Sequence, residues 1–174
     1  AISHTGANPN LELGMQNVLG AGVCEFHIFD MGNYGHLVPM ELDRACYHQW
    51  GLEKQDPSVE TPTPGKNMYG LRDTIKLLGH EKLDVIDVFK IDCEECEWET
   101  YNDWLGPDIP LLHQIQVEVH GVQEGKTVDF FDTLQAAGYL TFHKESNIQF
   151  GSRCIEYAFV KVEKSFIEGK NFAL

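Results

Sequence analysis

Three carboxylates and one histidine stand at the ends of apolar segments, where they could bind a polar ligand or move a proton. In chain order they are Asp30, Asp92, Glu118 and His120. A carboxylate accepts hydrogen bonds from hydroxyl groups, and a histidine gains or loses a proton near neutral pH because its free pKa is about 6.5. These residue types indicate acid–base chemistry on a bound polar molecule.

The segment before Asp92 predicts how that carboxylate is positioned. Residues 85–91 are apolar apart from two positions, which is typical of a strand covered on both faces. Apolar residues then recur at helical spacing, so we expect a helix from about Glu95. Ligands of an open α/β sheet bind at the carboxyl ends of its strands, and Asp92 occupies such an end.

Acidic residues crowd this turn and the start of the expected helix. They are Asp92, Glu94, Glu95, Glu97 and Glu99. Acids in a first helical turn interact favourably with the helix dipole, so most of them need no functional explanation. We select Glu94 as a candidate ligand contact, expect the three later glutamates to form a solvated face, and place Trp98 in the core.

The first 30 residues predict the first half of a nucleotide-binding α/β unit. A strand over 1–5, a turn at Gly6, an amphipathic helix over 11–19 and a strand over 23–29 follow one another. We expect the first strand to begin before Ala1.

The remaining segments predict alternating strands and helices. We expect a strand over 45–52, a helix over 71–78, a strand over 111–119, a helix over 130–137 and two late strands over 139–144 and 154–162. No helix fits between the two late strands, so they are predicted to be antiparallel neighbours. The result is a single α/β domain over residues 1–174, with a mostly parallel sheet that ends in an antiparallel β-hairpin.

Composition restricts the partners of the chain. Its 174 residues are 43% hydrophobic, enough for one domain with a core. The 27 acidic residues outnumber the 13 Lys and Arg, and the formal net charge is -14. Phosphate binding needs clustered cations, so we expect neither nucleic acid nor an anionic membrane as a partner. No apolar run reaches the roughly 20 residues of a membrane span.

The five cysteines do not predict a disulfide framework, because their number is odd and the chain is long. Cys93 and Cys96 form a C-x-x-C pair, a pattern that can be redox-active or bind zinc. Zinc would need a second ligand pair, which is not evident, and the neighbouring acids would raise a thiol pKa. We therefore treat the cysteines mainly as small apolar residues.

Four motifs, in order along the chain, carry a family resemblance. They are FHIFD at 26–30, KIDCEECEWE at 90–99, QVEVH at 116–120, and AGYLTFHKESN at 137–147 with CIEYAFVKV at 154–162. Together they resemble the class I S-adenosylmethionine-dependent methyltransferases, in the branch of FkbM-type and type 22-like methyltransferase-like proteins. The resemblance covers nearly the whole chain and implies a Rossmann-like fold.

Two positions depart from the pattern of that branch. Glu95 stands where the family usually has glycine, which a glutamate can replace if the backbone stays at negative φ. The first loop carries only Gly6, where many relatives carry two or three glycines.

The resemblance implies a binding site for S-adenosylmethionine. In it, Gly6 would allow close approach of the backbone, Asp30 would bind the ribose hydroxyls, and Met31 would pack on the adenine. Asp92 and Glu94 would face the methionine end. By the same resemblance, the acceptor is an oxygen of a small molecule or a sugar.

The catalytic residues that we expect are His120, Asp92 and Glu118, with His120 as the general base or as the group that orients the acceptor. His143 and Asn147 would line the acceptor pocket. A less favoured alternative is a divalent metal held by Asp92, Glu118 and His120, since some small O-methyltransferases bind a metal at the ends of their fourth and fifth strands.

Two other functions compete with an active methyltransferase. A catalytically degenerate methyltransferase-like fold could act as a binding module, because the first loop has few glycines and Glu95 replaces a glycine. A Rossmann-type dehydrogenase would need a fuller G-x-G-x-x-G and lacks the closing hairpin. The sequence does not set the oligomeric state.

Overall fold

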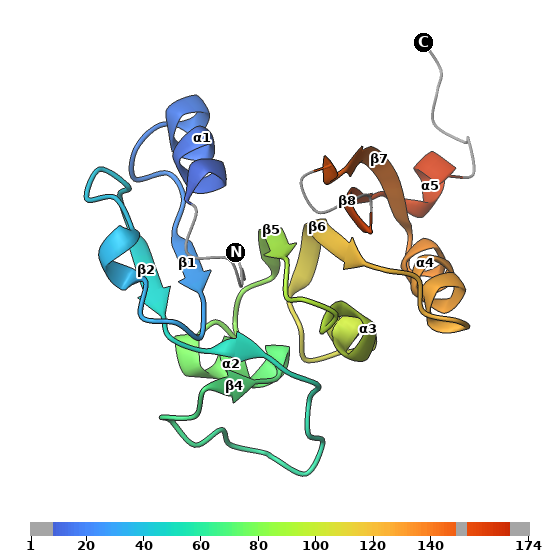
Figure 1. Cartoon of the computed structure of the whole chain (residues 1–174), viewed down its shortest axis with the longest axis horizontal. Coiled ribbons are helices and arrows are strands. Elements are labelled where there is room, and N and C mark those ends of the chain that lie inside the picture. The colour runs from blue at the N-terminus through green and yellow to red at the C-terminus, as the bar shows by residue number, and fades with distance from the viewer. Residues whose placement is uncertain (1–8, 149–152, 168–174) are drawn as a thin grey trace.

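The computed structural model describes residues 9–148 and 153–167 (Figure 1). The elements are α1 (Asn10–Leu19), β1 (Phe26–Phe29), the 3-10 helix η1 (Gly35–Leu37), β2 (Ala45–His48), β3 (Gly51–Leu52), β4 (Met68–Tyr69), α2 (Leu71–Leu78), β5 (Val85–Ile91), α3 (Glu97–Thr100), the 3-10 helix η2 (Tyr101–Leu105), β6 (Leu111–His120), α4 (Lys126–Ala136), β7 (Tyr139–Ser146), β8 (Cys154–Lys161) and α5 (Lys164–Ile167). The expected strand at 1–5 and Gly6 lie outside the described residues.

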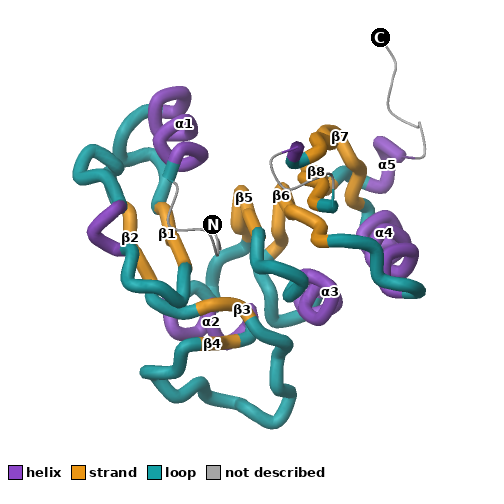
Figure 2. Tube along the Cα trace, viewed as in Figure 1, coloured by secondary structure: helices purple, strands orange, loops and turns teal. Residues whose placement is uncertain are grey.

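The largest sheet has the strand order β5-β6-β8-β7 (Figure 2). β5 and β6 are parallel, whereas β8 is antiparallel to both of its neighbours, β6 and β7. β1 pairs with β2 in parallel, and β3 with β4. The predicted antiparallel pairing of the two late strands is confirmed, with the last strand inserted between β6 and β7.

An aromatic cluster joins the helices to one face of this sheet. Phe130 of α4 is fully buried and packs edge-on against Trp98, Tyr101, Trp104 and Phe159. These rings come from α3, η2 and β8, so Phe130 joins α3, η2 and α4 to the sheet. Figure 1 shows α3 and α4 beside β6. Each edge-to-face pair of this kind contributes about 0.5–1.5 kcal/mol of stability beyond that from burial of the ring surfaces. The expectation that Trp98 is a core residue is confirmed.

The sequence predicted that β5 is covered on both faces along its whole length, and the structure does not bear this out. Val85 is exposed, and within the strand only Phe89 and Ile91 are buried. Side chains alternate across a strand, so Lys90 points away from the helices and lies in register with Gln116 of β6. The prediction fails at the start of the strand because Val85 and Ile86 pair with Leu111 and Leu112 at the end of the sheet where both strands begin.

Two helices differ in how well their sequence predicted them. α2 covers the predicted span and ends at Gly79, whose φ of 70° is readily adopted by glycine. α3 begins at Glu97 instead of Glu95 and is only four residues long. Glu94 and Glu95 have φ values of 53° and 80°, which cannot continue a right-handed helix. The expected strand over 45–52 is likewise divided, into β2 and β3.

None of the helices in the described part of the chain is long and apolar enough to cross a membrane.

Candidate functional site

Asp30 follows β1 directly and is 4% exposed. Its Oδ1 accepts a hydrogen bond from the Gly32 N–H at 2.7 Å, which closes a tight turn. Its Oδ2 is buried and has no hydrogen-bond partner in the described part of the chain. A buried carboxylate oxygen without a partner is costly, so this atom fits a hydrogen-bond donor supplied by a ligand.

The loop after Asp30 is fixed by Tyr47 of β2. The Tyr47 hydroxyl lies 2.6 Å from the Gly32 carbonyl and accepts a hydrogen bond from the Tyr34 N–H at 3.3 Å. Met31, at the centre of this loop, is partly exposed and approaches Gly51. The loop therefore presents Asp30 and Met31 from a positioned backbone, although a contact of Met31 with a ligand remains a prediction.

The turn after β5 is closed by a disulfide between Cys93 and Cys96. It carries Asp92 at its start and the two residues with positive φ, Glu94 and Glu95, at its tip. The expectation that these cysteines act as small apolar residues is wrong, because a three-residue separation brought their side chains together across the turn. A glutamate was expected to replace the usual glycine at position 95 only if the backbone kept a negative φ. The φ of Glu95 is 80°, so this expectation is wrong.

Two residues of α3 form hydrogen bonds with the backbone of His120 at the end of β6. Glu97 Oε1 accepts a hydrogen bond from the His120 N–H at 2.7 Å, and Trp98 Nε1 donates to the His120 carbonyl at 2.9 Å. Glu97 Oε1 also lies 3.1 Å from His120 Nδ1. Nε2 is left facing the turn after β5, 3.7 Å from Asp92 Oδ1 and 3.6 Å from Glu94 Oε2.

Glu97 is a residue of the candidate site that sequence reasoning missed. The expectation of a solvated face holds for Glu95 and Glu99, whereas Glu97 is fully buried. Its position immediately before the buried Trp98, within the E-W-E motif, was the available signal. In so short a helix, two adjacent residues can both face the protein interior.

The electrostatic environment assigns different charges to Asp92 and His120. Burial, followed by the nearby Glu118 carboxylate, raises the pKa of Asp92 to about 6. The hydrogen bond to Glu97 raises the pKa of His120 to about 9, against the opposing effect of burial. At neutral pH, His120 is therefore protonated and cannot accept a proton. Asp92 is ionised at that pH, and its pKa lies close to neutral pH, where a general base is most effective.

Glu118 is buried beside His120, and Asn147 Nδ2 donates a hydrogen bond to its Oε1 at 2.9 Å. On the neighbouring strand β8, Cys154 lies opposite His120 and Glu156 lies opposite Glu118. The structure thus brings the predicted residues Glu118, His120 and Asn147 together at one end of the sheet.

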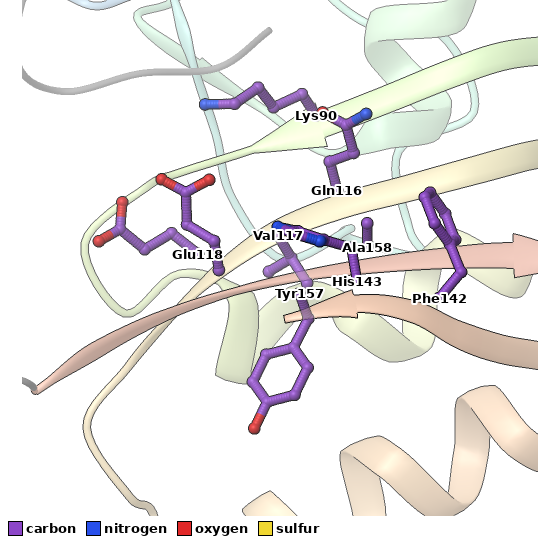
Figure 3. Close-up of a pocket in the computed structure, with 9 residues that line it drawn as sticks. Lys90, Gln116, Val117, Glu118, Phe142, His143, Tyr157 and Ala158 are labelled. Carbon is purple, nitrogen blue, oxygen red and sulfur yellow. The ribbon is translucent and has the colours of Figure 1, made fainter. Parts of the chain in front are cut away.

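His143 contributes to a pocket on the face of the sheet (Figure 3). This pocket has a volume of about 180 Å³, and its polar lining includes Lys90, Gln116, Glu118 and Glu156. His143 itself is exposed on β7 and lies 3.6 Å from Glu145. Glu118 therefore connects the two predicted acceptor residues, since it bonds to Asn147 and lines the pocket with His143.

The residues of the metal alternative do not form one ligand set in the described structure. Asp92 and Glu94 offer atoms within 4.8 Å of His120, whereas Glu118 groups separately with His120 and Cys154. The alternative would therefore need a different set from the predicted Asp92, Glu118 and His120.

Comparison with known proteins assigns the family. The model of a family described as a methyltransferase domain, Methyltransf_22, matches residues 2–161. The chain belongs to this methyltransferase domain family. The match confirms the predicted methyltransferase and its Rossmann-like α/β fold, and the FkbM-type branch remains a prediction.

Two further comparisons cover the methyltransferase domain. No curated protein sequence matches it. Among solved structures, it is similar to "a putative rRNA-methylase" from Clostridium thermocellum, with a TM-score of 0.48 and 12% sequence identity over 93% of this chain and 86% of that chain.

The described residues of the methyltransferase domain fit the donor that the family implies, S-adenosylmethionine. Its ribose has two adjacent hydroxyl groups. Oδ2 of Asp30, which has no hydrogen-bond partner among the described residues, is an acceptor at a strand end. Its methionine end carries an ammonium group, which suits the acidic turn that contains Asp92 and Glu94.

Proposed function

We propose that this domain transfers a methyl group from S-adenosylmethionine to an oxygen of a small molecule or sugar. The observation that carries the proposal is Asp30, whose Oδ2 is buried at the end of β1 without a partner in the described residues. A hydroxyl donor from a bound ribose would satisfy that atom and offset the cost of its burial.

The cofactor would be held by Asp30, Met31, Asp92 and Glu94, together with Gly6 from the segment outside the described residues. Bound there, it supplies an electrophilic methyl group on a sulfonium. The chain's own contribution is to position the acceptor and to exclude water. Buried Asp30 and the disulfide-closed turn are suited to this, because neither needs to become ordered when a ligand binds.

Deprotonation of the acceptor is assigned to Asp92 in this proposal, in place of His120. Asp92 is ionised at neutral pH with a pKa of about 6, so it can take a proton from a hydroxyl group. His120 is protonated and presents an N–H at Nε2 beside Asp92, where it would hold the acceptor oxygen and balance the charge of the acids. Glu118 supports this arrangement through its hydrogen bond to Asn147.

A small polar acceptor is supported by the pocket that Glu118 shares with His143. Its lining contains a cationic, an amide and two carboxylate side chains, at Lys90, Gln116, Glu118 and Glu156. These side chains would bind the hydroxyl groups of a sugar, and the apolar part of the lining, at Val117, Phe142 and Ala158, would cover its C–H groups.

The experiment that tests the proposal is a calorimetric titration of S-adenosylhomocysteine into the wild-type chain, Asp30→Asn and Asp43→Asn. Asp43 is exposed, so its variant removes the same charge outside the site. We expect micromolar binding that is lost in Asp30→Asn and kept in Asp43→Asn. Absence of binding by the folded wild type, or unchanged binding by Asp30→Asn, would overturn the proposal. Repeating the titration with a chelator tests the metal alternative.

A second candidate function is a catalytically inactive binding module. The observation in its favour is Glu95, which has a φ of 80° where the family usually has glycine. The two functions separate in a methyl-transfer assay with radiolabelled donor and a panel of hydroxylated acceptors. Binding of S-adenosylhomocysteine without transfer to any acceptor would favour the binding module.

A further inference from the structure

Three histidines that the candidate methyltransferase site does not use lie on β1, on β2 and in the connection between α2 and β5, next to the strand end that carries Asp30. His27 Nε2 lies 2.9 Å from Glu25 Oε1, and His80 Nε2 lies 3.9 Å from the same oxygen. These three ligand atoms all lie within 4.8 Å of one another. The two rings meet edge to face, with centroids 4.9 Å apart.

We propose that Glu25, His27 and His80 form a binding site for a divalent transition-metal ion of the zinc class. Two imidazole nitrogens and one carboxylate oxygen are ligands that such ions prefer. Around a tetrahedral zinc with bonds of about 2.0–2.1 Å, ligand atoms are about 3.3 Å apart. The observed separations bracket that value, so small side-chain movements would admit the ion.

Neighbouring residues orient the carboxylate ligand as a metal site requires. Glu25 Oε2 accepts a hydrogen bond from Arg44 Nη2 at 3.1 Å, which leaves Oε1 directed at the two imidazoles. The guanidinium thereby pairs with the oxygen that does not face the ion. His27 and His80 are mostly buried, whereas Glu25 is partly exposed, so the site is open to solvent on one side for entry of an ion and for a water ligand.

His48 is placed to orient the ring of His27. His27 Nδ1 lies 2.8 Å from His48 Nε2, and the rings are stacked with centroids 5.1 Å apart. One nitrogen of such a pair must donate and the other accept. If Nδ1 of His27 carries the proton, Nε2 has a lone pair for the ion, which is the usual arrangement of a metal-bound histidine and its hydrogen-bond partner.

The ion would connect two segments that are distant in the sequence. Glu25 and His27 belong to the chain that enters β1 and ends at Asp30, whereas His80 follows α2 and leads into β5, which ends at Asp92. Binding would therefore stabilise the folded chain in proportion to the ion concentration. The proposal does not depend on the function of the methyltransferase site.

The test is calorimetry with zinc on the chelator-treated full chain, with thermal unfolding followed in parallel. We expect one equivalent with micromolar or tighter affinity and a higher unfolding temperature. His80→Gln and Glu25→Gln should each weaken this binding about 10-fold or more, and His48→Phe about 10- to 100-fold. Circular dichroism of each variant establishes that it is folded.

Two control variants locate the ion. His36→Gln removes an exposed histidine of η1, and His120→Gln removes the histidine of the candidate methyltransferase site. Both should keep the zinc equivalent. The proposal is overturned if the folded wild type binds no zinc, if the equivalent survives His80→Gln, or if it disappears in His120→Gln.

Discussion

Glu97 and His120 form a buried pair in which one carboxylate oxygen contacts the histidine twice. Oε1 accepts from the His120 N–H at 2.7 Å and lies 3.1 Å from Nδ1. The first contact fixes the backbone at the end of β6, and the second fixes the orientation and the charge of the ring. The position of Nε2 relative to Asp92 therefore depends on a residue that itself faces no ligand.

Glu97→Gln should lower the pKa of His120 from about 9 toward its ordinary value, because the amide cannot stabilise the imidazolium. A raised folded-state pKa contributes stability below the unfolded value of about 6.5, and this contribution is lost as the pH rises through 9. The variant should therefore be less stable by about 1–3 kcal/mol at pH 6, with a smaller difference at pH 10. Urea unfolding at both pH values measures this, with Glu99→Gln as an exposed control. An equal loss at both pH values would contradict the assigned charge of His120.

Under the proposed function, kcat/KM should rise as the pH increases through about 6 and fall through about 9. The rise reports ionisation of Asp92. Burial, Glu118 and Glu94 raise the pKa of this carboxyl group, and Lys90 and His120 lower it. The fall reports loss of the His120 proton. Asp92→Asn should lower kcat by about 100- to 10,000-fold and remove the rise near pH 6. A rise that persists in this variant would assign the base to another residue.

Glu95→Gly should stabilise the protein, because Glu95 has a φ of 80°, where a side chain is strained by about 1–2 kcal/mol. Glycine recovers that strain but loses backbone entropy, so we expect a net gain of about 1 kcal/mol and a Tm higher by about 2–4 °C. Glu124→Gly, at an exposed position without positive φ, is the matched control and should not gain stability. Equal changes in Tm for the two variants would show that the turn is not strained.

Removing the disulfide should weaken both the fold and ligand binding at the turn after β5. The Cys93→Ser/Cys96→Ser variant should lose up to about 2 kcal/mol, the value expected for so short a loop. S-adenosylhomocysteine should also bind less tightly, because the turn that carries Asp92 must then become ordered on binding. Cys46→Ser, at an exposed free cysteine, should change neither quantity. Unchanged binding by the folded double variant would mean that the disulfide does not position the site.

The sequence predicted those features that depend on periodicity and local turn chemistry. The apolar spacing and Gly79 defined α2, and the absence of a helical segment before Cys154 predicted the antiparallel strands β7 and β8. Asp30, Asp92 and His120 were placed at the ends of their strands for the same reason. Such features are encoded within a few residues of each other, so no tertiary information is needed to find them.

Features that arise from contacts between distant segments were not predictable. The burial of Glu97 depends on the end of β6, which lies more than twenty residues later, and the charge of His120 depends in turn on Glu97. The positive φ values of Glu94 and Glu95 follow from the path that the turn takes between β5 and α3. The sequence pattern of acids in this helix does not distinguish a glutamate exposed to solvent from one that contacts a buried histidine.

The place of β8 in the sheet has a consequence for folding during synthesis. β6 pairs on one side with β5, which is synthesised before it. On the other side it pairs with β8, the last of these strands to be synthesised. Until β8 emerges, β6 and β7 both have an open edge, and the pairs Glu118–Glu156 and His120–Cys154 cannot form. Long-range pairing of this kind folds slowly, so a nascent chain that stops before residue 154 should be held by chaperones or aggregate.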